Sequence, residues 1–174
     1  MPSVSCDDHP SLWDFSLSHY ARADVADACL RLQDEHGGNV NLLLWCVWLE
    51  QRGLRLDAAR LRSAQKRIHA WDEHYVIPLR HLRRRMKVEF GVSDVGIEQL
   101  RSQIKHAELL AEKQVQLWLE MEVQTWDSPD NIPPLVPGDN LRFYLRQLNV
   151  TETAIAHLHK LLGCAPDSVV KPRI

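Results

Sequence analysis

Apolar residues recur at intervals of three and four along most of the chain, the spacing of residues that share one face of an α-helix. Runs in which β-branched and polar residues alternate, typical of strands, are missing. The pattern therefore predicts an all-α fold, a helical bundle with a long helical hairpin and a two-helix C-terminal extension.

Three helices are expected before residue 52. The first follows Pro10, with Ser11 as its N-cap, and runs to about residue 20. The second takes Asp24 as its N-cap and ends at Gly37-Gly38, because paired glycines are costly inside a helix and favourable just past its end. The third covers residues 40–51. Its positions 42–49 are all apolar, so it has no polar face and is predicted to be buried on every side.

Two longer segments are expected to form the hairpin. The first has apolar residues at near-heptad spacing, which predicts one face packed on a partner helix: Leu61, Ala64, Ile68, Trp71, Tyr75, Leu79, Leu82 and Met86. Pro78 interrupts it and either kinks the helix or starts a new one; the unchanged spacing across the proline favours a kink. The second, capped by Ser93 or Asp94, runs to about residue 126 with the same spacing at Ile97, Leu100, Ile104, Ala107, Ala111, Trp118, Met121 and Thr125.

These elements suggest a division of the chain. Residues 1–10 are expected to be a flexible N-terminus, residues 11–126 a helical bundle domain and residues 127–138, with four prolines, a linker. Residues 139–174 are expected to form the C-terminal extension, with helices at about 139–148 and 151–162 and a tail from Cys164.

Composition places the protein among soluble globular ones. Of the 174 residues 45% are hydrophobic, enough for a buried core. The longest apolar run has eight residues, whereas a membrane span needs about 20, and the N-terminus lacks the features of a signal peptide. The four cysteines, Cys6, Cys29, Cys46 and Cys164, form no CxxC pair and are expected to be reduced, with Cys29 and Cys46 in the core. We expect a cytoplasmic protein with no membrane partner.

Motifs of catalysis and cofactor binding are missing. The sequence has no GxSxG, no GxGxxG and no HExxH. Among nine histidines, the densest acidic neighbourhood is around His69 and Glu73, and two ligands do not make a metal site. No catalytic residue, metal or cofactor is therefore predicted.

Charge gives one positive indication. Residues 55–91 hold ten Lys or Arg against four Asp or Glu, although the whole chain has a net charge of −2. Arg80, Arg83, Arg84 and Lys87 lie close together on one helix and form what we call the basic ridge. The basic ridge could bind phosphates of a nucleic acid or a small anion. Alternatively, it pairs with acids of the next helix, of which Glu108, Glu112 and Glu120 are the candidates.

A weaker indication comes from Gln33 and Asn41, which flank Gly37-Gly38. They could line a pocket with Trp45 and Arg80. The simpler alternative is that Asn39 or Asn41 caps the third helix and the tryptophans pack in the core.

Three stretches carry a resemblance to a known family: Leu-Trp-Asp-Phe-Ser at 12–16, Val-Ala-Asp-Ala-Cys-Leu-Arg-Leu-Gln-Asp at 25–34 and Asn-Val-Asn-Leu-Leu-Leu-Trp-Cys at 39–46. With these, residues 11–126 resemble a family of small helical proteobacterial proteins whose domain has no assigned function. The resemblance implies a bacterial cytosolic helical protein and supplies no activity.

The leading hypothesis is a non-enzymatic interaction or regulatory protein that binds a protein partner, or a second copy of itself, through its helical surfaces. A second hypothesis is a regulator that binds nucleic acid or an anionic ligand with the basic ridge. A third is a small-ligand binder or enzyme with a pocket near Asn41, Trp45 and Arg80.

Overall fold

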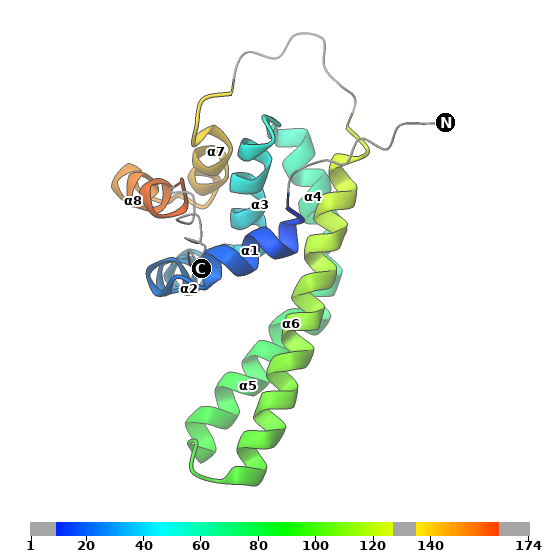
Figure 1. Cartoon of the computed structure of the whole chain (residues 1–174), viewed down its shortest axis with the longest axis vertical. Coiled ribbons are helices and arrows are strands. Elements are labelled where there is room, and N and C mark those ends of the chain that lie inside the picture. The colour runs from blue at the N-terminus through cyan, green and yellow to red at the C-terminus, as the bar shows by residue number, and fades with distance from the viewer. Residues whose placement is uncertain (1–9, 127–134, 164–174) are drawn as a thin grey trace, which may run out of the picture. The chain divides into compact units, whose positions relative to one another are not determined.

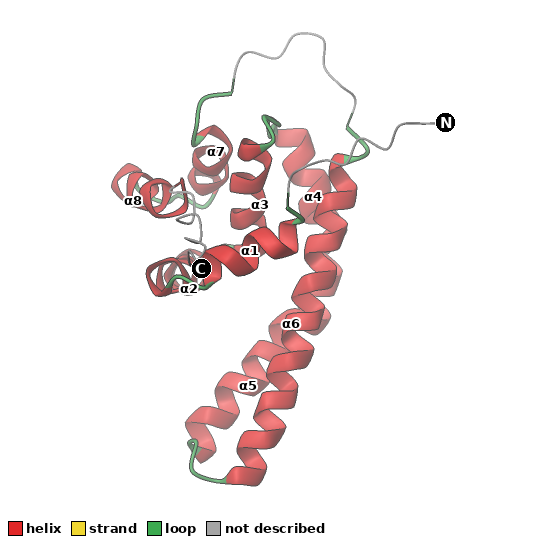
Figure 2. Cartoon of the chain, viewed as in Figure 1, coloured by secondary structure: helices red, strands yellow, loops and turns green. Residues whose placement is uncertain are grey.

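A computed structural model describes residues 10–126 and 135–163, and these are helical apart from short connections (Figure 2). The elements are α1 (Leu12–Tyr20), α2 (Ala23–His36), α3 (Val40–Gln51), α4 (Ala58–Trp71), a π-helical turn η1 (Asp72–Val76), α5 (Ile77–Phe90), α6 (Val95–Val123), α7 (Asp139–Gln147) and α8 (Glu152–Gly163). The all-α prediction is confirmed. The predicted flexible N-terminus, most of the proline-rich linker and the tail lie outside the described residues, as do Cys6 and Cys164.

Caps decide where several helices begin and end. The Ser11 hydroxyl accepts the Asp14 N–H at 3.1 Å, and the side chains of Asn39 and Asp94 accept the N–H groups of Leu42 and Ile97 in the same way. The prediction that Asp24 caps α2 is wrong, because α2 begins at Ala23 and Arg22, two residues before Asp24, takes the capping position. Asp24 lies in the first turn and forms an ion pair with Arg22, a place where a carboxylate also favours the helix dipole.

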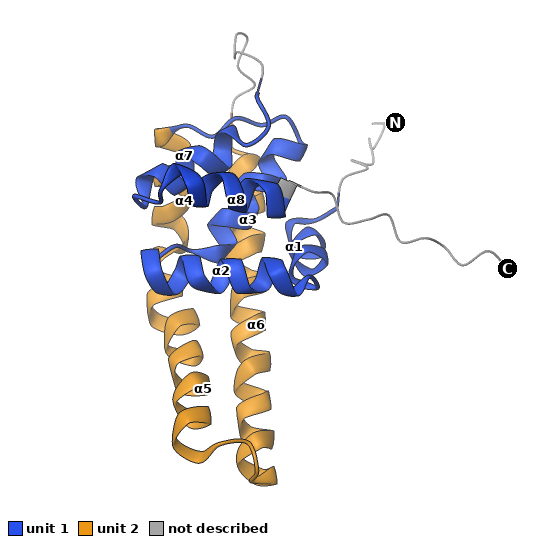
Figure 3. Ribbon diagram, turned by 90° about the vertical axis from the view of Figure 1, so that its left-hand side faces the viewer, with its two compact units in different colours: residues 1–57, 128–174 blue, residues 58–127 orange. Residues whose placement is uncertain are grey.

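The chain divides into two compact units (Figure 3), the first made of residues 1–57 and 128–174 and the second of residues 58–127. In the first unit, α3 is the central helix, in contact with α1, α2 and α7. All of its residues from 40 to 49 are buried, as its uniform apolar sequence predicts. Cys29 and Cys46 are buried free thiols in this core, and burial raises the pKa of Cys29 to about 12.

Helices α7 and α8 also belong to this first unit. Glu50 of α3 accepts the N–H groups of Gly138 and Leu141 at 2.8 and 2.9 Å, and so caps α7. Buried Asn140 accepts the Leu56 N–H at 2.8 Å and donates to the Leu54 carbonyl at 2.7 Å. The compact units thus differ from the sequence-based division into residues 11–126 and 139–174, because these bonds join helices distant in sequence.

The second unit is the predicted hairpin. Helices α4, η1 and α5 form one continuous helical segment that runs antiparallel to α6 (Figure 1). The chain does not leave the helical conformation at Pro78. Instead η1 places the extra residue of a π-turn just before the proline, and the Ile77 N–H bonds to the Asp72 carbonyl, which accommodates a residue that has no N–H of its own.

Part of the predicted apolar stripe is wrong because of the π-turn. An extra residue in one turn rotates the following side chains, so Val76 is buried and Tyr75 is 53% exposed. Leu82 is also exposed, whereas Met86 is buried as predicted. On α6 the buried apolar residues are Ala111, Val115 and Leu119, while Leu100 and Met121, both predicted to be in the stripe, are exposed.

Candidate interaction surface on the helical hairpin

Two residues of the basic ridge form a network of ion pairs within the hairpin. Arg80 and Arg83 of α5 both contact the Glu108 carboxylate on α6, with Arg80 Nε 3.1 Å from one oxygen. Arg80 also forms an ion pair with Glu112 through the Nη2 atom of its guanidinium group. The Glu108 side chain is only 6% exposed, against 14% for Arg80 and 24% for Arg83. We call Arg80, Arg83, Glu108 and Glu112 the ion-pair cluster.

The two carboxylates of the ion-pair cluster have opposite pKa shifts. Burial of Glu108 disfavours its charge, but the hydrogen bonds and charges of Arg83 and Arg80 outweigh this, so its pKa is lowered. Burial raises the pKa of Glu112, and the nearby Glu108 charge adds to this, against the opposing effect of Arg80. Two arginines therefore hold one fully charged carboxylate tightly, and the second carboxylate is less well compensated.

The rest of the basic ridge is arranged differently. Arg84 is half-buried and has interactions of its own. Lys87 is exposed, and its charge contributes, after that of Arg101, to a lowered pKa of Glu98. The sequence left pairing of the basic ridge with acids of α6 as an alternative. Arg80 and Arg83 do form such pairs, with Glu108 and Glu112. It leaves Lys87 facing solvent.

Gln33 and Asn41 lie in the other compact unit. Asn41 is buried within α3, Gln33 is half-buried on α2, and Asn39 is the residue that caps α3. Trp45 is completely buried, and Trp48 donates its Nε1–H to the Pro10 carbonyl at 3.0 Å. Asn39 therefore caps α3 and the two tryptophans pack in the core, as the simpler alternative predicted. Arg80 belongs to the ion-pair cluster of the second unit.

A feature that sequence reasoning missed lies at the turn where α5 joins α6 (Figure 1). Four apolar side chains are exposed there, which we call the hairpin tip: Val88 at 86%, Phe90 at 55%, Val92 at 60% and Val95 at 72%. Gly91, with φ of +70°, makes the turn in their midst. The signal in the sequence was an apolar run around a turn glycine, where polar residues are usual.

Basic residues border the hairpin tip. Between residues 82 and 105 there are six Lys or Arg and three Asp or Glu. Arg85 pairs loosely with Glu89 at 3.7 Å, and Arg101 pairs with Glu98. The tip is therefore an apolar patch in a surrounding of net positive charge.

Comparison with known proteins gives one match. The model of a family described as a protein of unknown function, DUF2390, matches residues 11–119. The chain belongs to this family. The DUF2390 region covers α1 to α5 and most of α6, and it leaves out α7 and α8. No curated protein and no solved structure matches the chain.

Two further searches of the described residues concern membranes and metals. Within residues 10–126 and 135–163, no helix has the length and apolar character needed to cross a membrane. In the same ranges, no three His, Cys, Asp or Glu side chains come together as a metal site, and His69 and Glu73 form only a pair at 3.4 Å.

Proposed function

We propose that this chain is a non-enzymatic interaction protein, and that its hairpin tip binds a protein partner. The observation that carries the proposal is the group of four exposed apolar side chains around the turn that joins α5 to α6. Exposed apolar residues gathered in one patch are typical of binding surfaces, whereas single ones are common everywhere. Burial of such side chains in a partner would stabilise a complex by roughly 25 cal/mol per Å² of apolar surface before the costs of association.

The charge around the tip indicates what the partner surface is like. A tip with a net positive surrounding fits an apolar pocket bordered by acidic side chains. Two tips of the same chain would instead bring like charges together, which argues against tip-to-tip self-association. Arg80 and Arg83 are engaged with Glu108, so the basic ridge has fewer cations to offer to phosphates, and this favours a protein partner over a nucleic acid.

The partner can be sought with a photoreactive amino acid placed at Phe90 of the full-length chain in its native cell. We expect a crosslink to one protein, at a site bordered by Asp and Glu. The matched control carries the same amino acid at Val136, which is 57% exposed against 55% for Phe90 but lies in the first unit. No crosslink to that protein is expected from position 136.

Native mass spectrometry of gently purified protein gives an independent result. The wild type should retain the partner, the double variant F90S/V92S should lose it and the control L30S/V136S, with exposed residues of the first unit, should keep it. Equal crosslinking from both positions, retention by F90S/V92S, or a crosslink to nucleic acid, lipid or a second copy would each overturn the proposal.

A further inference from the structure

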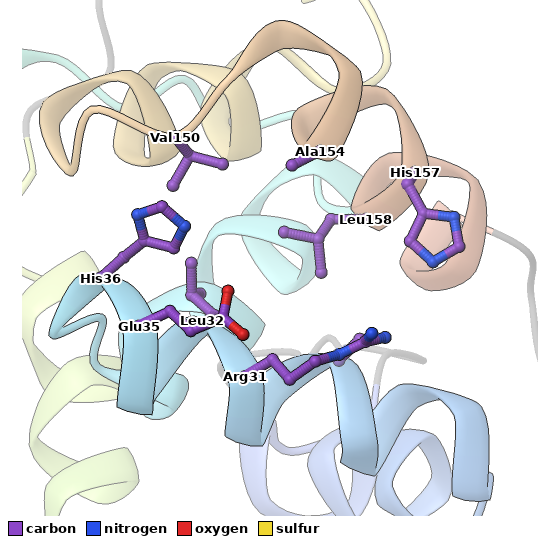
Figure 4. Close-up of a pocket in the computed structure, with 9 residues that line it drawn as sticks. Arg31, Leu32, Glu35, His36, Val150, Ala154, His157 and Leu158 are labelled. Carbon is purple, nitrogen blue, oxygen red and sulfur yellow. The ribbon is translucent and has the colours of Figure 1, made fainter.

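A pocket in the first unit, far from the hairpin tip in sequence, has no role in the function proposed above. It lies between α2 and α8 and has a volume of about 230 Å³ (Figure 4). This is smaller than the roughly 300–1,000 Å³ typical of drug-sized ligands. At about 30 Å³ for each water-sized group, it has room for roughly eight such groups, about the size of a small amino acid.

The floor of the pocket is apolar and its rim is polar. Leu32, Val150 and Leu158 contribute the floor, and all three side chains are buried. The rim consists of four titratable residues that come from both helices: Arg31, Glu35, His36 and His157. In Figure 4, Arg31 and His157 lie toward one end of the pocket, and Glu35 and His36 lie toward the other.

Arg31 and Glu35 do not pair with each other. They are four residues apart on α2, a spacing that allows an ion pair across one helical turn, and His69 and Glu73 form such a pair on the second unit. Among the described residues, the side chains of Arg31 and Glu35 make no hydrogen bond or ion pair. The pocket therefore presents one positive and one negative side chain, whose Cα atoms are about 6 Å apart along the helix axis, above an apolar floor.

The surrounding charge argues against a simple anion. A shallow depression beside the pocket is lined by Asp27, Asp34 and Glu35 together with Arg31. Three carboxylates around one guanidinium would repel a phosphate or a fatty acid. A ligand that brings an ammonium group as well as a carboxylate meets attraction from both signs.

We propose that this pocket binds a small zwitterion with an aliphatic side chain, a free α-amino acid of the size of valine or leucine. Its carboxylate pairs with Arg31, since a guanidinium offers two parallel donors to a carboxylate. Its ammonium group pairs with Glu35, and its side chain lies on Leu32, Val150 and Leu158.

Three probes separate the contributions of the two charges. Isothermal titration calorimetry of the full-length chain would compare L-leucine, 4-methylpentanoate, which keeps only the carboxylate, and 3-methylbutylamine, which keeps only the ammonium group. We expect L-leucine to bind at least about tenfold more tightly than either analogue, because each analogue leaves one charged partner unmatched.

Two exposed-site variants test the assignment with little risk to folding. Arg31→Met should weaken L-leucine binding without weakening that of the amine, and Glu35→Gln should weaken L-leucine binding without weakening that of the carboxylate. Arg62→Met, at an exposed arginine of α4, is the control and should bind L-leucine as the wild type does. Absence of L-leucine binding, equal binding of 4-methylpentanoate, or equal weakening by Arg62→Met would overturn the proposal.

Discussion

Replacing Glu108 by Gln should destabilise the hairpin strongly, although the two side chains have nearly the same shape. The Glu108 carboxylate is 6% exposed and holds both Arg80 and Arg83. Removing one partner of a fully buried ion pair costs about 3–5 kcal/mol, because the other charge stays buried without compensation. Here Arg80 keeps Glu112 and Arg83 is 24% exposed, so we expect a smaller loss of about 2 kcal/mol in the free energy of unfolding.

Hydrogen exchange measured by mass spectrometry suits this prediction, because it reports α5 and α6 separately from the helices of the first unit. Peptides from 77–90 and 95–123 should exchange faster in E108Q, and those from α3 should not change. Glu98→Gln is the matched control, since Glu98 forms an ion pair of the same chemistry with Arg101 and its side chain is 38% exposed, against 6% for Glu108. Its effect should be much smaller, because water solvates the Glu98 carboxylate and weakens the pair.

The double variant R83M/E108M adds a second comparison. Apolar side chains of similar length remove both charges, so at least half of the stability lost in E108Q should return. Two results would refute the reasoning. One is an E108Q protein within about 0.5 kcal/mol of the wild type, the range of ordinary surface substitutions. The other is an E98Q effect as large as that of E108Q.

Three further predictions concern pH and the first unit. Because the pKa of Glu112 is raised in the folded state, its protonation stabilises the fold; this contribution is fully present below the ordinary value of 4.5 and is lost as the pH rises through the raised pKa. E112Q should abolish that dependence in urea unfolding curves recorded from pH 7 downward, and an unchanged slope would contradict it. Asn140→Ala leaves the Leu56 N–H and Leu54 carbonyl without their partner and should cost about 2–4 kcal/mol in chemical denaturation; a cost under about 0.5 kcal/mol would mean that α7 does not depend on this joint. Gly138→Ala places a Cβ 2.7 Å from the His159 ring at a φ of +88°, so thermal unfolding should show a loss of about 1–2 kcal/mol from the backbone conformation alone. Adding His159→Ala removes the clash with the ring, so it should restore only the part of the stability loss that exceeds this backbone cost. Full recovery of stability would show that backbone strain is absent.

The positions of the helices follow from local sequence signals. Ser11, Asn39 and Asp94 each have a short polar side chain that can satisfy an N–H of the next turn, and Gly37 adopts the positive φ that ends α2. The burial of α3 is equally local, because a helix with no polar face is stable only where water is excluded. These properties depend on residues within one or two turns of one another, so the sequence by itself determines them.

Other properties required the tertiary structure. The π-turn before Pro78 shifted the buried face from Tyr75 to Val76, and a fixed spacing cannot anticipate one extra residue in a turn. The sequence named Glu108 and Glu112 as partners for the basic ridge only as one alternative, since either a carboxylate or a ligand can satisfy a guanidinium. The pocket joins Arg31 and Glu35 to residues more than 100 positions away on α8. The tertiary structure decides such pairings because they depend on which helix faces meet, and local spacing carries no information about that.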